Sequence, residues 1–173
     1  MRTPSPLAAL LVAALAAGCS SEPIAGPTGA EPSAARASAA APVQRPMSGH
    51  CESRFNPPPF PPPAIHRQTD VGTCQLAHLG RTALHGVQEI DFAAGTQSGE
   101  RTFTAANGDE LHARHAGTSA MVAPGRIAFS AVITIVGGTG RFEGATGELR
   151  VSGVAVLAET RATMTIDEGW IAY

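Results

Sequence analysis

Apolar and polar positions alternate along the chain from about residue 65 to its end. The alternating runs are short, and glycine, asparagine and aspartate separate them. A period of two is typical of β-strands that bury one face. In residues 81–92, the more apolar face consists of Leu84, Gly86, Gln88, Ile90 and Phe92. Helix patterns are nearly absent, so residues 65–173 are predicted to form an all-β domain.

Further alternating runs raise the prediction to seven or eight antiparallel strands. Asn107-Gly108-Asp109 has the composition of a tight hairpin turn. The other runs cover residues 101–105, 110–118, 126–136, 148–157, 161–167 and 169–173. Spacings of this kind are typical of a sandwich or a barrel. Many strand positions hold small residues, and closing a sheet removes its exposed edges, so we favour a barrel.

The N-terminal region predicts export from the cytoplasm. Arg2 precedes an apolar run, Leu7–Ala17, which is too short to span a bilayer as a helix. A basic start, an apolar stretch and small residues indicate a secretory signal peptide over residues 1–18. Leu-Ala-Ala-Gly-Cys, ending at Cys19, resembles the lipobox of bacterial lipoproteins, which implies lipid attachment at Cys19. The alternative is an ordinary signal peptide followed by a chance cysteine.

The lipobox resemblance also implies a location. A lipidated Cys19 would anchor the chain to a membrane of the bacterial envelope, after export across the inner membrane. Ser20 follows the cysteine, where aspartate would favour retention in the inner membrane of enteric-type bacteria. The outer membrane is therefore favoured.

Residues 19–64 are rich in alanine, proline, serine and glycine and are predicted to be a linker. Its last part, residues 57–63, reads PPPFPPP, which favours an extended polyproline conformation. We interpret this run as a stiff spacer, with Phe60 packing on the domain. The alternative is a ligand for a proline-recognising domain.

The cysteine count predicts at most one disulfide within the chain. With Cys19 lipidated, Cys51 and Cys74 remain to pair in an oxidising compartment. Two unpaired thiols are the alternative. A zinc site is disfavoured because neither cysteine belongs to a Cys-x-x-Cys pair.

Composition excludes some functions. The formal net charge is -2, which argues against a dedicated nucleic-acid-binding protein with a basic face. All 12 basic residues are arginine, so the chain has no lysine nucleophile or Schiff-base lysine.

The sequence gives only weak signals for catalytic or metal-binding residues. His112 and His115 are three apart in a strand and so face opposite sides, and exposed histidines are the default expectation. Glu89, Asp91 and His85 share one face of their strand, and we assign that face to solvent. Gln88 lies on the apolar face, either orienting a ligand in a barrel lumen or serving as a hydrogen-bonded core amide. We predict no catalytic residues, metal site or cofactor.

Residues 136–147 are rich in glycine but do not match a phosphate-binding loop. Glu143 stands where a dinucleotide-binding fingerprint needs its third glycine, and strands rather than a helix flank the segment. We predict a sharp turn between two strands, with Phe142 plugging the barrel end or anchoring the turn. The glycines of this turn are Gly137, Gly138, Gly140 and Gly144.

This segment carries a family resemblance. ITIVGGTGRFEGATGELRVSG, at residues 133–153, resembles a turn and its strands in the allene oxide cyclase and dirigent superfamily. AHLGRTALHG (77–86) and TFTAANGDELHA (102–113) look like earlier strands of secreted bacterial members. The resemblance covers roughly residues 70–173. It implies an eight-stranded antiparallel barrel of the calycin type, whose lumen can hold an apolar ligand. Plant members form trimers, which makes a homo-oligomer an expectation.

The resemblance does not supply an active site. Plant allene oxide cyclases rearrange a fatty-acid epoxide, and dirigent proteins steer the coupling of phenolic radicals. No catalytic residue of either group matches a position here. We therefore expect an envelope lipoprotein whose barrel binds an apolar ligand or a protein partner, and we favour a non-enzyme over an enzyme. The alternatives are an isomerase or cyclase of an oxidised lipid, and a structural or assembly protein of the envelope.

Overall fold

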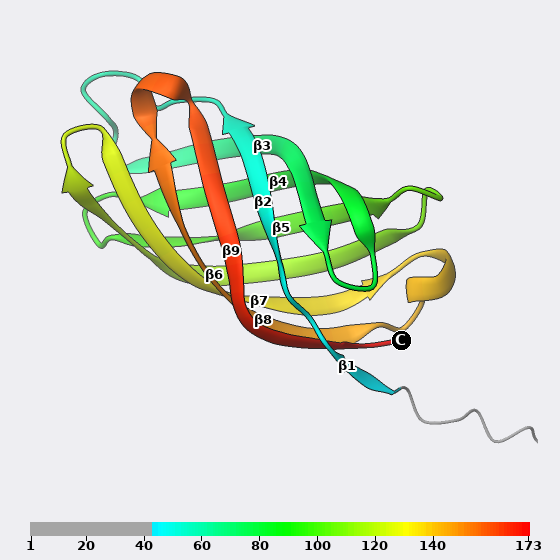
Figure 1. The fold of residues 1–173 in the computed structure, drawn as a ribbon. Coiled ribbons are helices and arrows are strands. Elements are labelled where there is room, and N and C mark those ends of the chain that lie inside the picture. The colour runs from blue at the N-terminus through cyan, green and yellow to red at the C-terminus, as the bar shows by residue number, and fades with distance from the viewer. Residues whose placement is uncertain (1–42) are drawn as a thin grey trace, which may run out of the picture. The chain divides into compact units, whose positions relative to one another are not determined.

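Residues 43–173, which a computed structural model describes, form an antiparallel sheet closed into a barrel (Figure 1). Strands β2 to β9 pair in sequence order, and β9 pairs back onto β2. The predicted eight-stranded antiparallel barrel is therefore confirmed. No helix within the described range is long and apolar enough to cross a membrane. The eight strands are β2 (Gly49–Phe55), β3 (Ile65–Leu76), β4 (Gly80–Asp91), β5 (Thr96–Ala105), β6 (Glu110–Ala123), β7 (Arg126–Gly138), β8 (Thr146–Val156) and β9 (Arg161–Ala172).

The barrel begins earlier than the predicted boundary at residue 65. The short strand β1 (Gln44–Pro46) and then β2 pair along successive parts of β9. Within β2 only Cys51 and Phe55 are buried, so the alternation is weak and lies next to a proline run. This weak pattern explains why the sequence placed β2 in the linker. The signal peptide, Cys19 and the linker up to residue 42 lie outside the described residues.

Antiparallel pairing sends successive connections to opposite ends of the barrel. We call one end the open end; it carries residues 56–64, 92–95, 124–125 and 157–160. We call the other the closed end; it carries residues 47–48, 77–79, 106–109 and 139–145. The two ends differ in what fills the barrel.

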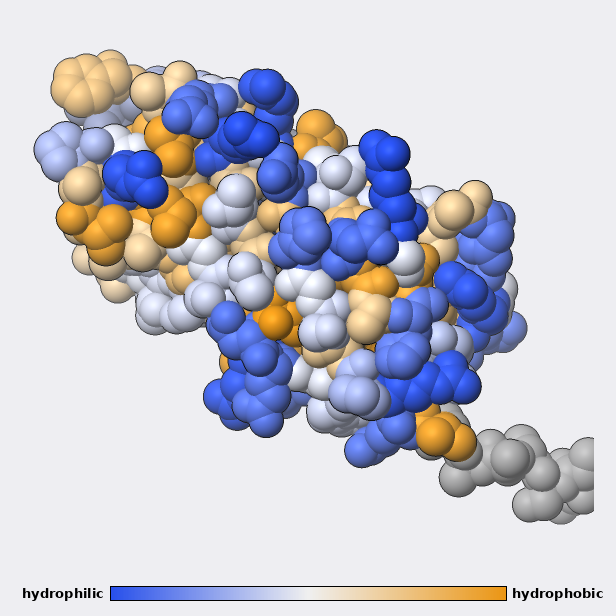
Figure 2. All heavy atoms as spheres, in the orientation of Figure 1, coloured by the Kyte–Doolittle hydropathy of each residue, from blue (hydrophilic) through white to orange (hydrophobic). Residues whose placement is uncertain are grey.

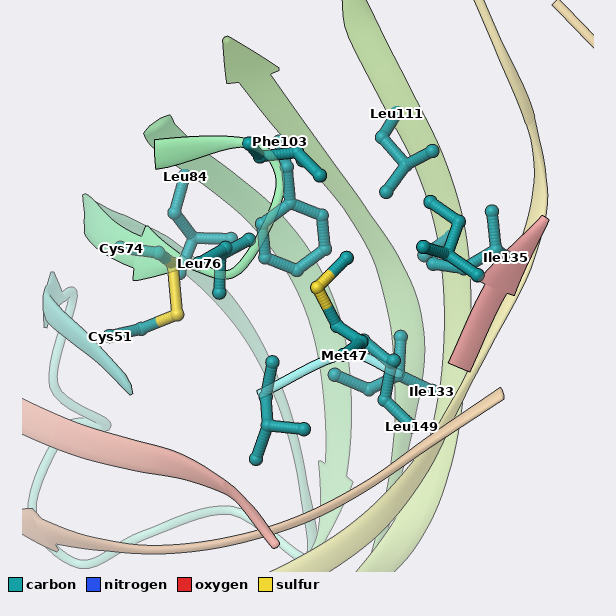
Figure 3. Close-up of a cluster of buried hydrophobic side chains, with 14 of the residues drawn as sticks. Met47, Cys51, Cys74, Leu76, Leu84, Phe103, Leu111, Ile133, Ile135 and Leu149 are labelled. Carbon is teal, nitrogen blue, oxygen red and sulfur yellow. A yellow bond between two sulfur atoms is a disulfide. The ribbon is translucent and has the colours of Figure 1, made fainter. Parts of the chain in front are cut away.

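The closed end is filled by apolar side chains (Figure 3). Phe142 is 0 % exposed, and its ring makes an edge contact with Tyr173 at 5.0 Å between ring centroids. Burial of this kind stabilises the fold by roughly 25 cal/mol for each Å² of apolar surface removed from water. The same cluster includes Met47, Leu76, Leu79, Phe103, Leu111, Ile133, Ile135, Leu149 and Ile171.

The glycine-rich turn brings Phe142 into this core. Residues Gly140–Phe142 form a 3-10 turn between β7 and β8. Gly140 has a positive φ of 55°, and a Cβ there would collide with the Asp109 carboxylate. Gly138 has no room for a side chain either, because a Cβ would meet the Cβ of Phe142 at 2.7 Å. The glycines thus allow the chain to turn closely enough for Phe142 to plug the closed end.

Cys51 and Cys74 form the predicted disulfide. The two residues are directly opposite each other on β2 and β3, and both are buried. The bond closes the segment that contains the proline run. Phe60, in that run, is 97 % exposed, so the expectation that it packs on the domain was wrong.

Candidate ligand-binding site

The middle of the barrel interior is polar rather than apolar. Strand β3 points Gln68 and Asp70 inward, and β5 points Gln97 and Arg101 inward. All four are at most 8 % exposed. Their neighbours Ile65 and Val71 on β3 are more than half exposed, so the usual alternation is inverted on this strand.

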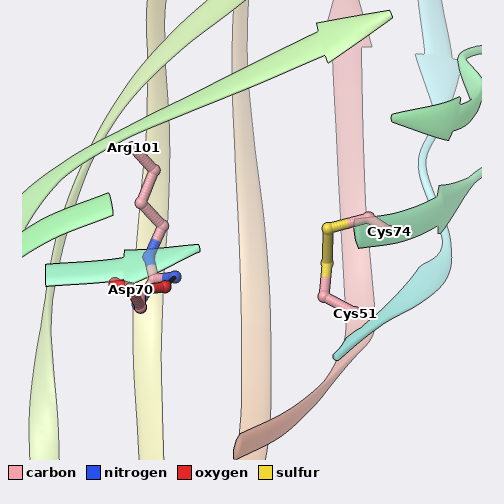
Figure 4. The surroundings of a disulfide bond; sticks show 4 residues. All are labelled: Cys51, Asp70, Cys74 and Arg101. Atoms are coloured by element: carbon pink, nitrogen blue, oxygen red, sulfur yellow. Dashed lines mark hydrogen bonds and ion pairs between the residues drawn. A yellow bond between two sulfur atoms is a disulfide. The ribbon is translucent and has the colours of Figure 1, made fainter. Parts of the chain in front are cut away.

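Asp70 and Arg101 form a buried ion pair across an intervening strand. Arg101 Nη1 donates a hydrogen bond to Asp70 Oδ2 at 2.9 Å (Figure 4). Gly86 of β4 lies between them, directly opposite both residues. A Cβ on Gly86 would lie 2.4 Å from Asp70 Oδ1. The missing side chain of Gly86 therefore makes room for the carboxylate beside it.

A second polar contact repeats this arrangement one step along the strands. Gln88 of β4 and His115 of β6 lie on either side of Gly99 of β5. His115 Nε2 and Gln88 Oε1 are 3.0 Å apart. Arg101 Nη2 also donates to Gln88 Oε1, at 3.3 Å. The Gln88 oxygen thus joins both contacts, and we call Asp70, Gln88, Arg101 and His115 the polar cluster.

His115 is neutral in this setting. Burial, and then the positive charge of Arg101, lowers the pKa of His115 to about 3. An oxygen acceptor at Gln88 requires Nε2 to carry the proton of the neutral ring. His115 Nδ1 is then left as a buried acceptor with no partner among the described residues.

The ion pair itself is incompletely satisfied. Within residues 43–173, Asp70 Oδ1 and Arg101 Nε have no hydrogen-bond partner although both atoms are buried. Unpaired buried polar atoms of this kind cost roughly 1 to 3 kcal/mol each. One is an acceptor and the other a donor, so a single group that both donates and accepts would match them.

A cavity lies between the polar cluster and the open end. Its volume is about 50 Å³, several times the roughly 10 to 15 Å³ that one water molecule needs. Asp70, Gln88 and Arg101 line it, together with Gln68 and Gln97. The apolar side chains that line it include Phe55, Ile90, Phe92, Ile127, Phe129, Leu157 and Met164. The cavity is therefore amphipathic, with polar groups in the middle of the barrel and an apolar approach from the open end.

The open end also exposes apolar side chains to solvent. Phe60 in the β2–β3 connection and Met121 and Val122 near the end of β6 are all mostly exposed. Figure 2 shows hydrophobic residues grouped over the end where the β6–β7 and β8–β9 hairpins turn. Pro58, within the proline run, lines the cavity, so this connection forms part of its entrance.

Of the candidate residues from the sequence, Gln88 and His115 lie in the barrel interior, whereas His112 does not. Gln88 lies in the interior, where it lines the cavity and contacts two polar side chains. His115 is only 5 % exposed, so the default expectation of an exposed histidine was wrong for this residue. His112 lies on the other side of β6, half-buried, with Nε2 3.1 Å from Glu110 Oε2.

The carboxylates of β4 lie outside the site. Glu89 and His85 are exposed, and Asp91 accepts hydrogen bonds from the backbone N–H groups of Ala93 and Ala94 in a turn. Residues 43–173 contain no group of three histidine, cysteine, aspartate or glutamate side chains placed to hold a metal ion. The interior site therefore offers hydrogen bonding and an apolar wall, with Asp70 and Arg101 as its charged groups.

Asp70 and Arg101 were not recognised as site residues from the sequence. Both lie at inward positions beside other polar or glycine inward residues, His66 and Gln68 on β3 and Gln97 and Gly99 on β5. A signal was present in the inverted alternation of β3, where Ile65, Thr69 and Val71 alternate with His66, Gln68 and Asp70. This alternation predicts a strand, but the apolar residues of the segment lie on the outer face of the barrel.

Comparisons with protein-family models, with curated proteins and with solved structures find no match to this chain. The resemblance to the allene oxide cyclase and dirigent superfamily consequently stays a prediction from the sequence.

Proposed function

We propose that this protein is a lipid-anchored barrel of the bacterial cell envelope that binds a small, mainly apolar molecule in its open end. The observation that carries the proposal is the cavity, which has an apolar approach and is lined by Asp70 and Arg101, each with a buried polar atom that has no partner in residues 43–173. The anchor at Cys19 is the expectation from the sequence and supplies the proposed location.

Stability alone does not account for the polar cluster. A buried ion pair is often no more stabilising than apolar side chains of similar volume. The closed end demonstrates that this barrel can be filled with apolar residues such as Phe142 and Leu149. Keeping Asp70 and Arg101 in the interior beside a cavity therefore favours a role in recognising a ligand.

The binding proposal can be tested with a neutral fluorescent probe. The full chain would carry Cys19→Ser to prevent lipidation there, and N-phenyl-1-naphthylamine fluorescence would be titrated. Ala162 lines the cavity, and the next residue on β9, Thr163, is exposed. We expect Ala162→Phe to weaken probe binding at least about tenfold, which corresponds to about 1.4 kcal/mol.

Thr163→Phe is the matched control, because it adds the same ring to the outer side of the same strand. We expect it to leave probe binding unchanged. Equal effects of the two variants, or no probe binding by the parent chain, would contradict a ligand site in the barrel interior. Native mass spectrometry of the same preparation would identify any small molecule that co-purifies.

An isomerase or cyclase acting on an oxidised lipid is the second candidate. The observation that favours it is a set of polar groups, Asp70, Gln88 and Arg101, beside an apolar wall. The methyl ester of an unsaturated fatty-acid epoxide is a suitable test substrate, followed by chromatography and mass spectrometry. A product of unchanged mass that forms with the parent chain but not with Arg101→Met would support this candidate. Recovery of the ester alone would leave binding as the function.

A further inference from the structure

The unpaired atoms of the ion pair restrict the kind of molecule that the cavity accepts. Asp70 Oδ1 can accept a hydrogen bond and Arg101 Nε can donate one, and both residues line the cavity. A hydroxyl group is a donor and an acceptor at once. An ether or ester oxygen could use only Arg101, and it would leave the Asp70 oxygen unpaired.

The charges inside the cavity balance. Asp70 and Arg101 are the charged residues among those that line it, and they are paired at 2.9 Å. A ligand carboxylate would lose its hydration shell and meet a site with no net positive charge, with Asp70 beside it. A ligand ammonium would meet Arg101 in the same way. Burying an uncompensated charge is costly, so ions of either sign are disfavoured.

The dimensions suggest how such a molecule would lie. A cavity of about 50 Å³ has room for the polar group of a ligand, several times the space that one water molecule needs. The apolar side chains Phe55, Phe129 and Leu157 line the same cavity. The apolar part of the ligand would therefore extend along them toward the open end.

We infer that the interior site selects an uncharged alcohol or phenol whose hydroxyl group donates to Asp70 Oδ1 and accepts from Arg101 Nε, and that it discriminates against carboxylates of the same length. This inference rests on the proposed binding function and specifies the class of ligand.

A matched series of eight-carbon probes tests it. 1-Octanol, its isomer 1-methoxyheptane and octanoate would each be used to displace N-phenyl-1-naphthylamine from the full chain carrying Cys19→Ser at pH 7.5. The ether is more apolar than the alcohol, so a purely apolar pocket would bind the ether better. We expect 1-octanol to displace the probe at concentrations about tenfold lower than the ether, the change that one buried hydrogen bond supplies. Octanoate is expected to be weaker than 1-octanol.

Asp70→Asn tests the role of charge directly. It leaves Arg101 unpaired and gives the cavity a net positive charge, so octanoate should then displace the probe better than 1-octanol. Glu89→Gln is the matched control, because it removes one negative charge from the exposed face of β4. It should keep the order of the parent chain.

A second variant covers the case in which Asp70→Asn fails to fold. Asp70→Leu combined with Arg101→Met makes this part of the wall apolar, and the ether should then bind at least as well as the alcohol. Probe binding with equal or better displacement by the ether or by octanoate in the parent chain would overturn this inference alone. Absence of probe binding would overturn the proposed function and this inference with it.

Discussion

The closed and open ends of the barrel use the same strands but fill the interior in opposite ways. At the closed end, the side chains of Phe142 and its apolar neighbours pack against one another. Toward the open end, Asp70 and Arg101 occupy inward positions, and a cavity takes the place of a core. Closing a barrel therefore does not require a fully apolar interior. One well-packed end can stabilise the fold while the other carries polar groups at a cost in stability.

The largest expected effect comes from removing the plug of the closed end. Phe142→Ala should lower the free energy of unfolding by about 3 to 5 kcal/mol, because it deletes a buried ring and leaves a cavity. The measurement is urea unfolding followed by circular dichroism. Phe60→Ala is the control at the open end, where the ring is exposed and the expected change is within about 0.5 kcal/mol. Similar losses for both variants would contradict the distinction between the ends.

Breaking the buried ion pair should have an effect of similar size for a different reason. Asp70→Asn should cost about 3 to 5 kcal/mol, since it leaves the Arg101 charge buried without its partner. Asp70→Leu combined with Arg101→Met removes both charges and should recover most of that loss. If the double variant is less stable than Asp70→Asn, the ion pair contributes more to folding than we infer.

The disulfide should contribute somewhat less. It joins residues 23 apart in the sequence, and removing it should cost about 3 kcal/mol by the loop-entropy argument. The measurement is thermal unfolding of a variant carrying Cys51→Ala and Cys74→Ala, beside the parent chain with and without a reducing agent. A variant as stable as the oxidised parent would show that the β2–β3 connection does not need this constraint.

The smallest effect concerns pH. The pKa of His115 is about 3 in the folded barrel and near 6.5 when unfolded, so the unfolded chain binds a proton first as the pH falls. This residue should therefore remove about 2 kcal/mol of stability between pH 8 and pH 5. His115→Gln should flatten that part of the pH profile, whereas His112→Gln, on the half-buried outer position, should not. Identical profiles for the two variants would contradict a buried, neutral His115.

The sequence predicted the parts of the barrel whose inward face is apolar. In β7, Ile127, Phe129, Ile133 and Ile135 follow the period-two pattern, and the strand was expected from it. The glycine turn was recognisable because several glycines close together indicate a backbone with positive φ angles, which glycine adopts readily. Both features depend only on residues close together in the sequence, so they can be recognised without knowing which strands pair.

The polar half of the interior was not predictable in this way. The inward positions in the first half of β3 hold His66, Gln68 and Asp70, so a search for an apolar face finds the wrong side of this segment or none. The contact between Asp70 and Arg101 depends on Gly86, which belongs to a third strand. Gln88 was found because its own strand has an apolar inward face. A conflict between pattern and fold is expected where a protein keeps polar groups for a function.

The most direct test of the central claim is a crystal structure of the full chain carrying Cys19→Ser, grown with 1-octanol. The account predicts the alcohol inside the open end, with its oxygen within hydrogen-bonding distance of Asp70 Oδ1 and Arg101 Nε. Its carbon chain should lie against Phe129 and Leu157. Octanol found only on the outer surface, or a cavity closed by rearranged side chains, would contradict a ligand site in the barrel interior.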